Sequence, residues 1–377
     1  MKRFFFVSVI LITLLLTGCS LSDNTNENMK NNTVIESENS STNVSKELDK
    51  NLTIDAEAKV PDAENYNVLN VKYKEYNSEQ VCDLLLKDDI IDTRNEYGTG
   101  SDKSIIIETK NNKVLSISKE SLYFSLKDNG YSRLRFELDQ FLFDDMKHKF
   151  PKDELISLNK KESIDKVRQI AKALNLHIDD EPIVYSMDID SLKAAENNFM
   201  TDEEAAEWEA MKPGTGKRNW TEDEEGYLIV FKSSSNNIPI YSRDLVLSSD
   251  NSHLNRSELN AVVTKNGIAS FEVSSMYDLV SIDTENLSCI DYSQALEVVK
   301  NKYKNIIITD PIKITNINLE YIPRLKDKKL GEFKLTPAWV FTTEEENEVI
   351  DSITNNKKIQ KSTKAILVDA ITGKEIK

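Results

Sequence analysis

Residues 335–342 read Leu-Thr-Pro-Ala-Trp-Val-Phe-Thr, with Trp339 and Phe341 two positions apart. Successive side chains of a strand point to opposite faces of its sheet, so these two aromatic rings fall on one side. The pattern predicts a strand of an antiparallel sheet with one apolar face. A helix predicted just upstream can cover that face, because Asp291 and Gln294 have the spacing of a capping box and apolar residues follow at helical intervals.

Further strands and a turn complete the block that starts at this helix. The turn is predicted at Thr372-Gly373, where the Asp369 side chain is placed to accept hydrogen bonds from the turn backbone. Strands are predicted at residues 314–322, 335–342 and 365–369, with a short one at 375–376.

The block before it shows the same order of elements. Ser163 is predicted to cap a helix whose apolar residues between 164 and 174 share one face. Both blocks run helix, strand, strand, strand and turn, so the sequence predicts an α+β fold in which each antiparallel sheet packs against one helix. In the middle block the predicted strands are 183–189, 227–231, 238–247, 259–264 and 268–273.

An N-terminal α+β unit is predicted ahead of these two blocks. Its strand at 68–73 precedes a helix capped by Asn77, and strands at 104–109 and 114–118 form a hairpin. The stretch 131–150 fits either a strand or a helix. The predicted folded units are therefore 60–150, 151–278 and 279–377.

The first residues have the order of a secretory signal. Lys2 and Arg3 precede an almost uninterrupted apolar run of 13 residues at 4–16, which is shorter than the roughly 20 residues that span a bilayer. Leu16-Thr17-Gly18-Cys19 resembles the bacterial lipobox, in which cysteine becomes the lipidated first residue. The sequence thus predicts a signal peptide at 1–18 and a protein held by the lipid on Cys19 at the extracytoplasmic face of the cell membrane. A plain secretory signal with an incidental Cys19 is the alternative.

Residues 19–59 are predicted to be a lipidated, disordered tether, because polar residues dominate and apolar ones are scattered singly. The other two cysteines, Cys82 and Cys289, are predicted to be small core residues. Whether they pair in a disulfide is left open.

The charge balance limits the possible partners. The 64 acidic and 48 basic residues give a net charge of -16, which becomes about -18 once Lys2 and Arg3 leave with the signal. This sign excludes non-specific nucleic-acid binding through phosphates. An anionic membrane would also repel the chain, so attachment is predicted to come from the lipid alone.

Four stretches carry a resemblance to a known family. The helix start at 291–296, the strand around 319–321, the segment 335–341 and the ending Val-Asp-Ala-Ile-Thr-Gly-Lys-Glu-Ile at 368–376 resemble PepSY-type and YycH/YycI-type extracytoplasmic domains of Firmicutes. The whole layout is similar to that of uncharacterised clostridial lipoproteins. The resemblance implies two tandem PepSY-like units and a non-enzymatic surface or regulatory module. The middle block departs from the pattern through an insertion at about 193–225.

The insertion is rich in acidic residues and contains two of the three tryptophans. Carboxylates of the region 202–225 could act as the acid and base of a cell-wall hydrolase, but an N-capped, solvated helix is favoured. If the insertion binds a partner, Trp208 and Trp220 are its predicted anchors. Trp339 could mark a pocket, although a tryptophan in an alternating strand is more often a core residue.

The sequence contains no recognisable catalytic or metal-binding motif. The three histidines, His148, His177 and His253, stand in neither a metal spacing nor a nucleophile motif. No catalytic residue, metal or cofactor is therefore predicted. The predicted function is a non-enzymatic, lipid-anchored module that binds an envelope protein or peptide through the insertion or a sheet edge, with the hydrolase as the alternative.

Overall fold

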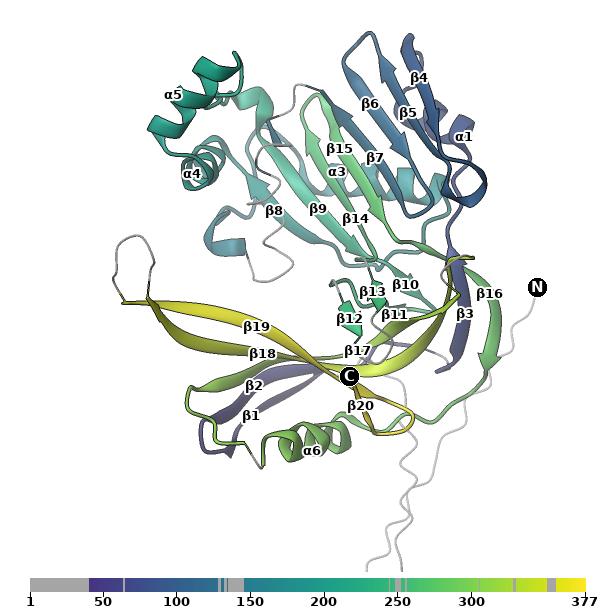
Figure 1. The fold of residues 1–377 in the computed structure, drawn as a ribbon, viewed down its shortest axis with the longest axis vertical. Helices are drawn as coiled ribbons and strands as arrows, with labels where there is room; N and C mark the ends of the chain where they lie inside the picture. Colours follow the sequence, from purple (N-terminus) through teal and green to yellow (C-terminus); the bar gives the residue numbers. More distant parts are fainter. Residues whose placement is uncertain are drawn as a thin grey trace, which may run out of the picture. The chain divides into compact units, whose positions relative to one another are not determined.

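Two eight-stranded sheets account for most of the strands in the computed structural model (Figure 1). The structure describes residues 41–377 except 64, 128–129, 132–133, 135–145, 244, 248–251, 255, 305, 328–329 and 351–356. The predicted signal peptide, Cys19 and most of the ambiguous stretch 131–150 lie outside the described residues. Among the helices that are described, none has the length and apolar character needed to cross a membrane.

Sheet I has the strand order β4-β5-β6-β7-β15-β14-β9-β8, and every pairing in it is antiparallel. Strand β9, which lies beside the edge strand β8, is buried on both faces, because Tyr227, Ile229 and Phe231 point to one core and Leu228 and Val230 to another. The strands are β4 (Ile91–Tyr97), β5 (Ser104–Thr109), β6 (Lys113–Ile117), β7 (Ser121–Leu126), β8 (Ile183–Met187), β9 (Gly226–Lys232), β14 (Glu258–Thr264) and β15 (Gly267–Ser274).

Helices α1 (Ser78–Leu85) and α3 (Lys160–Ala173) pack against one face of sheet I. The predicted cap of α1 is confirmed, because the Asn77 side chain accepts hydrogen bonds from the backbone N–H groups of Glu79 and Gln80. The predicted cap of α3 is wrong. Asn159 caps the helix, and Ser163 lies buried in its first turn, where its hydroxyl donates to the Asn159 carbonyl at 2.8 Å.

The insertion covers the other face of sheet I. It folds into α4 (Ile189–Phe199), α5 (Asp202–Met211) and the short 3-10 helix η4 (Glu222–Glu224), and residues 189–225 are here named the α4–α5 arm. Leu192, Ala195 and Trp220 of this arm are buried with the outer side chains of β8 and β9. The arm is therefore packed into the fold at its base.

Sheet II has the order β1-β2-β17-β18-β19-β20, and β3 and β16 extend it beside the first residues of β18. Its pairings are antiparallel except the parallel one between β2 and β17. The strands are β1 (Thr42–Asp49), β2 (Leu52–Lys59), β3 (Val68–Tyr73), β16 (Tyr277–Thr284), β17 (Ile312–Asp327), β18 (Glu332–Ile350), β19 (Lys357–Asp369) and β20 (Glu375–Ile376).

Helix α6 (Tyr292–Tyr303) covers one face of sheet II as predicted. The Asp291–Gln294 capping box is present, and the strand predicted at 335–342 lies within β18. The predicted turn is also confirmed, because Asp369 accepts hydrogen bonds from the backbone N–H groups of Ile371 and Thr372. Mixed α and β structure with antiparallel sheets and packed helices is thus the observed architecture.

The strand predicted at 238–247 does not exist as one element. It divides into β11 (Ile238–Pro239), which pairs with β10 (Ser234–Ser235), and β12 (Leu245–Leu247), which pairs with β13 (Ser252–Leu254). Pro239 has no N–H to donate to a ladder, and residues 238–241 leave sheet I to cover sheet II. Two further 3-10 helices are η1 (Gly100–Asp102) and η3 (Met146–His148).

The predicted tether is wrong for residues 42–59, which form the β1–β2 hairpin of sheet II. Alternation along β2 explains why, because Leu52, Ile54, Ala56 and Ala58 are buried while polar residues lie between them. Two of these residues are alanines, so the apolar periodicity is weak in the sequence.

The two sheets also combine strands from the predicted units. Strand β7 pairs with β15 across the boundary predicted at 150/151, and the boundary at 278/279 falls inside β16. Strand β3 belongs to the same sheet as the final block. Backbone pairing therefore joins segments that local patterns assign to separate units.

Candidate functional site

Trp339 lies in the core of sheet II. Its side chain is 1% exposed, its Nε1 donates to the Ile290 carbonyl at 2.8 Å, and the Tyr292 ring makes an edge contact with it. Every polar group of the indole is therefore used inside the fold. Trp339 is therefore a core residue, the interpretation that the alternating strand favours, and not the binding residue of a pocket that the sequence also allowed.

Trp220 is also buried, at 3% exposure, and it attaches the α4–α5 arm to sheet I. Its Nε1 donates to Glu196 Oε2 at 2.8 Å, while the Arg218 backbone N–H donates to Glu196 Oε1 at 2.9 Å. A Cβ on Gly130 would lie 2.4 Å from the indole ring, so this position needs glycine for close packing. Trp220 is thus a buried residue that holds the arm against sheet I, and not the partner-binding residue expected from the sequence.

Trp208 has a different position, on the solvent side of α5. Only Ala205 of this helix is buried, whereas Trp208 is 45% and Met211 76% exposed. At 3.6 residues per turn, Glu204, Trp208 and Met211 lie within about 60° of one another around the helix, and Glu207 lies one turn before Met211. The arm therefore presents an aromatic ring and a thioether beside two carboxylates, and Trp208 is the predicted anchor that remains accessible.

Many of the other carboxylates in the region 202–225 have structural partners. Glu204 closes a capping box with Thr201, and Glu209 accepts hydrogen bonds from the backbone of Gly214 and Gly216. Asp202 pairs with Lys217, Glu224 with Arg218 and Asp223 with Lys265. These contacts support the interpretation of the region as a capped, ion-paired structural segment.

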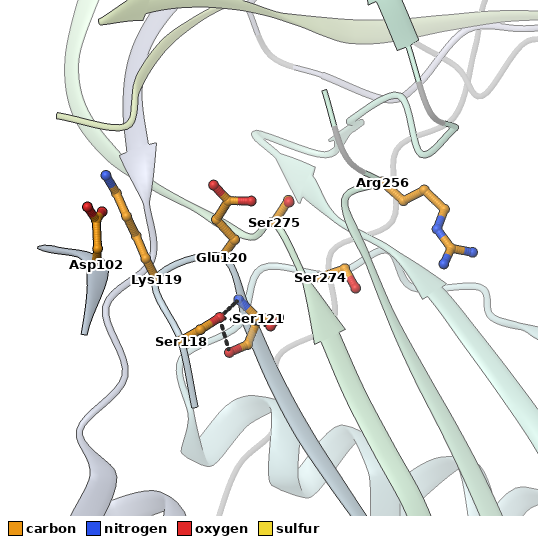
Figure 2. Close-up of a pocket in the computed structure, with 8 residues that line it drawn as sticks. All are labelled: Asp102, Ser118, Lys119, Glu120, Ser121, Arg256, Ser274 and Ser275. Atoms are coloured by element: carbon orange, nitrogen blue, oxygen red, sulfur yellow. Dashed lines mark hydrogen bonds between the residues drawn. The ribbon is translucent and has the colours of Figure 1, made fainter. Parts of the chain in front are cut away.

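A polar cavity of about 490 Å³ opens at one end of sheet I (Figure 2). The β6–β7 turn, η1 and the ends of β14 and β15 line it with Asp102, Ser118, Lys119, Glu120, Ser121, Arg256, Ser274 and Ser275. Ser118 and Ser121 bond to each other, with 2.9 Å between their hydroxyl oxygens, and the Ser275 N–H donates to the Glu120 carbonyl at 2.7 Å.

This cavity lacks the arrangement that activates a serine. No histidine is among its lining residues, and Figure 2 shows the Arg256 guanidinium turned away from the four serines. Arg256 instead lies 3.6 Å from Glu258. Within the described part of the chain, no group of three or more His, Cys, Asp or Glu side chains is placed to hold a metal ion.

The two described cysteines are free thiols in separate cores. Cys82 packs beside α1 against sheet I, and Cys289 packs near α6 against sheet II. Burial raises the pKa of Cys289 to about 12, so its thiol stays protonated and unreactive at neutral pH. Both therefore act as the small core residues that the sequence predicts.

A charged cluster between the two sheets is not predicted from the sequence. Lys232 at the end of β9 pairs with Glu320 of β17, with 3.0 Å between Nζ and Oε1. Asp179 lies next to them, its backbone N–H donating to the Lys232 carbonyl, and its Oδ1 is buried with no hydrogen-bond partner among the described residues. No sequence signal marks this cluster, because its members lie far apart in the chain.

Desolvation controls the titration of Asp179. Burial raises the pKa of its carboxyl to about 7, although the nearby Lys232 ammonium acts in the opposite direction. Glu320 and Asp180 raise this pKa further, and the same Glu320 carboxylate raises the pKa of Lys232. The carboxylates of Asp179 and Glu320 therefore face one lysine. Asp179 is the less well paired of the two, and its pKa lies near 7.

The overall fold is shared with a solved structure. The crystal structure of an uncharacterised protein from Eubacterium rectale is similar to this chain, with a TM-score of 0.66, 17% sequence identity, and coverage of 89% of this chain and 93% of that one. At this identity the likeness shows the fold alone. No protein-family model and no curated protein matches the chain.

Proposed function

We propose that this chain is a lipid-anchored, extracytoplasmic binding or regulatory module without catalytic activity, which engages a membrane or cell-envelope protein or peptide. The observation that carries the proposal is the outer face of the α4–α5 arm. Trp208 and Met211 stay exposed there, although the base of the arm is packed through Trp220 and Glu196. Exposed aromatic side chains on a well-anchored element are typical centres of protein interfaces.

The sequence resemblance supports the same proposal. Residues 291–376 resemble PepSY-type domains, and helix α6 on sheet II and helix α3 on sheet I are consistent with two PepSY-like units in tandem. Modules of this type are associated with modulating membrane sensors or inhibiting proteases. The partner would be reached from the outer side of the membrane, where the lipid on Cys19 holds the chain.

Photo-crosslinking in intact cells tests the arm. With benzoylphenylalanine at position 208 of the full-length chain, we expect one discrete adduct with an envelope protein, because a buried interface holds the partner within reach of the ring. The same adduct should form from position 207 and be lost when Met211→Ser is added. Position 307 is the control, since Ile307 is 92% exposed but lies outside the arm. Equal yields from 208 and 307 would contradict the proposal.

Fatty-acid labelling tests the anchor. Cells grown with an alkyne-labelled palmitate should label the wild-type chain and not the Cys19→Ala variant, because only the thiol can form the thioether to the lipid. The variant should also move from the membrane fraction to the soluble fraction. No label on the wild-type chain would show that the plain secretory signal is the correct alternative, and label that persists in Cys19→Ala would place the lipid on another residue.

A further inference from the structure

Strand β16 exposes an apolar edge of sheet II. Leu279 and Val280 are each 55% exposed and Ile282 is 42% exposed, whereas Tyr277 at the start of the strand is buried. The strand pairs with β3 on one side, and no described strand pairs with its other side (Figure 1). An unpaired row of backbone N–H and C=O groups thus lies next to three large apolar side chains.

These side chains continue the core of sheet II to its edge. Leu279 stands opposite Val71 of β3, which stands opposite Phe333 of β18. Ile282, Leu69 and Leu335 form a second row of the same kind. Residues directly opposite each other project to the same face, so two apolar rows run from the buried cluster to the edge, where their last members are exposed.

The charges that β16 itself contributes to this edge are acidic, and each carboxylate stays about one-third exposed although a lysine of the chain pairs with it. Asp278 pairs with Lys74 and Asp283 with Lys334, each at 3.0 Å, and β16 itself contains no basic residue. A second copy is disfavoured as the occupant, because antiparallel pairing of two β16 strands with Leu279 opposite Ile282 would set Asp278 opposite Asp283. A segment with lysine or arginine at those positions would complement the edge.

The other exposed apolar edge, β4, is built differently. Ile91 and Tyr97 are exposed there, but Asp92, Arg94 and Glu96 alternate in sign along the strand. All seven residues of β4 are exposed, so no apolar row leads from a core to this edge. Mixed charges on an edge strand discourage pairing with another chain, and β4 therefore serves as a matched control.

We propose that the edge of β16 is a docking surface for an extended segment of a partner protein, which adds a strand to sheet II. The segment places apolar side chains beside Leu279 and Ile282 on one face and lysine or arginine side chains near Asp278 and Asp283 on the other. Bulges in β16 near Val280 and Asp283 curve the edge, so the segment has to be short and matched to that curve. This inference rests on the proposed binding function and names one surface and the chemistry of its partner.

A labelled probe peptide tests the surface on the purified full-length chain. The probe is a fluorescein-labelled octapeptide of alternating Val and Lys, and its controls are a Val/Glu octapeptide and a Val/Lys octapeptide with N-methylated alternate amides. We expect saturable anisotropy for the Val/Lys probe and at least about tenfold weaker binding for both controls, which lack the charge or the backbone donors. Backbone amides of 277–284 should exchange more slowly with deuterium when the probe is bound.

Paired variants locate the binding. Leu279→Ser with Ile282→Ser should weaken binding of the Val/Lys probe by at least about tenfold. Ile91→Ser with the exposed Ile90→Ser, directly before β4, should leave its binding unchanged. Equal binding of the Val/Glu probe, no saturable binding, or no effect of the β16 pair would overturn the inference. These failures leave the crosslinking result at position 208 untouched, so the two proposals can fail separately.

Discussion

Replacing Trp339 with alanine is expected to lower the free energy of unfolding by about 4 kcal/mol. The indole is 1% exposed and packs with Phe341 of β18 and with residues of α6 and β19. Its removal would leave a cavity under α6 and an unpaired carbonyl on Ile290. Denaturant unfolding followed by circular dichroism measures the loss without relying on tryptophan emission.

Two variants control for this result. Trp339→Phe keeps most of the apolar volume and loses the hydrogen bond, so it should cost about 1–2 kcal/mol. Trp208→Ala removes the same side chain from an exposed site and should change the unfolding free energy by less than about 0.5 kcal/mol. A loss of the same size for Trp339→Ala and Trp208→Ala would contradict the placement of Trp339 in the core.

Replacing Asp179 with asparagine is expected to stabilise the chain by about 2 kcal/mol at pH 8. The pKa of this carboxyl is about 7 in the folded chain, against an ordinary value of 3.8. The full shift corresponds to about 4 kcal/mol, and we take half because the side chain keeps partial contact with solvent. Asparagine has nearly the same shape and no charge to bury.

The sign of the pH dependence follows from the raised pKa. Below pH 3.8 the carboxyl is protonated in both states, so its contribution to stability is fully present and the variant should match the wild type. Between pH 3.8 and about 7 that contribution is lost, because the unfolded chain ionises freely and the folded chain does not. The variant should therefore gain stability relative to the wild type as the pH rises through this range, and the difference in unfolding free energy should stay constant above it.

Melting temperatures of both chains between pH 4 and 8 measure this difference directly. Asp180→Asn, at the exposed neighbouring position, is the control variant measured over the same range. If the difference in melting temperature between Asp179→Asn and the wild type stayed constant from pH 4 to 8, the raised pKa of the buried Asp179 carboxyl would be disproved.

Local chemistry explains which elements could be predicted. The caps at Asn77 and Asp291 depend on side chains within three residues, and the structure contains both. The strand around Trp339 depends on alternation within one segment, which the printed sequence displays. The misplaced cap at Ser163 shows the limit, because Asn159 four residues earlier has the same capping chemistry and the helix begins there.

The candidate surfaces were predictable only in part. Trp208 and Trp220 are equivalent by local pattern, but Glu196 accepts the Trp220 N–H, while no comparable contact within the described ranges buries Trp208. Strand β16 follows the last strand predicted for the middle block. Its place at the edge of sheet II is known only from the structure, in which β3 is the one described strand that pairs with it. The cluster of Asp179, Lys232 and Glu320 joins three segments that share no pattern.

The sequence by itself determined the α+β class, the helices capped at Asn77 and Asp291, and the strand that contains Trp339, because each arises from interactions within a few residues. Lipidation of Cys19 and the binding function remain predictions. The tertiary structure alone decided that residues 42–59 join sheet II, that the predicted units share sheets, and which tryptophan reaches solvent. These outcomes depend on backbone pairing and burial between distant segments, and their free energy comes from partners that no local pattern identifies.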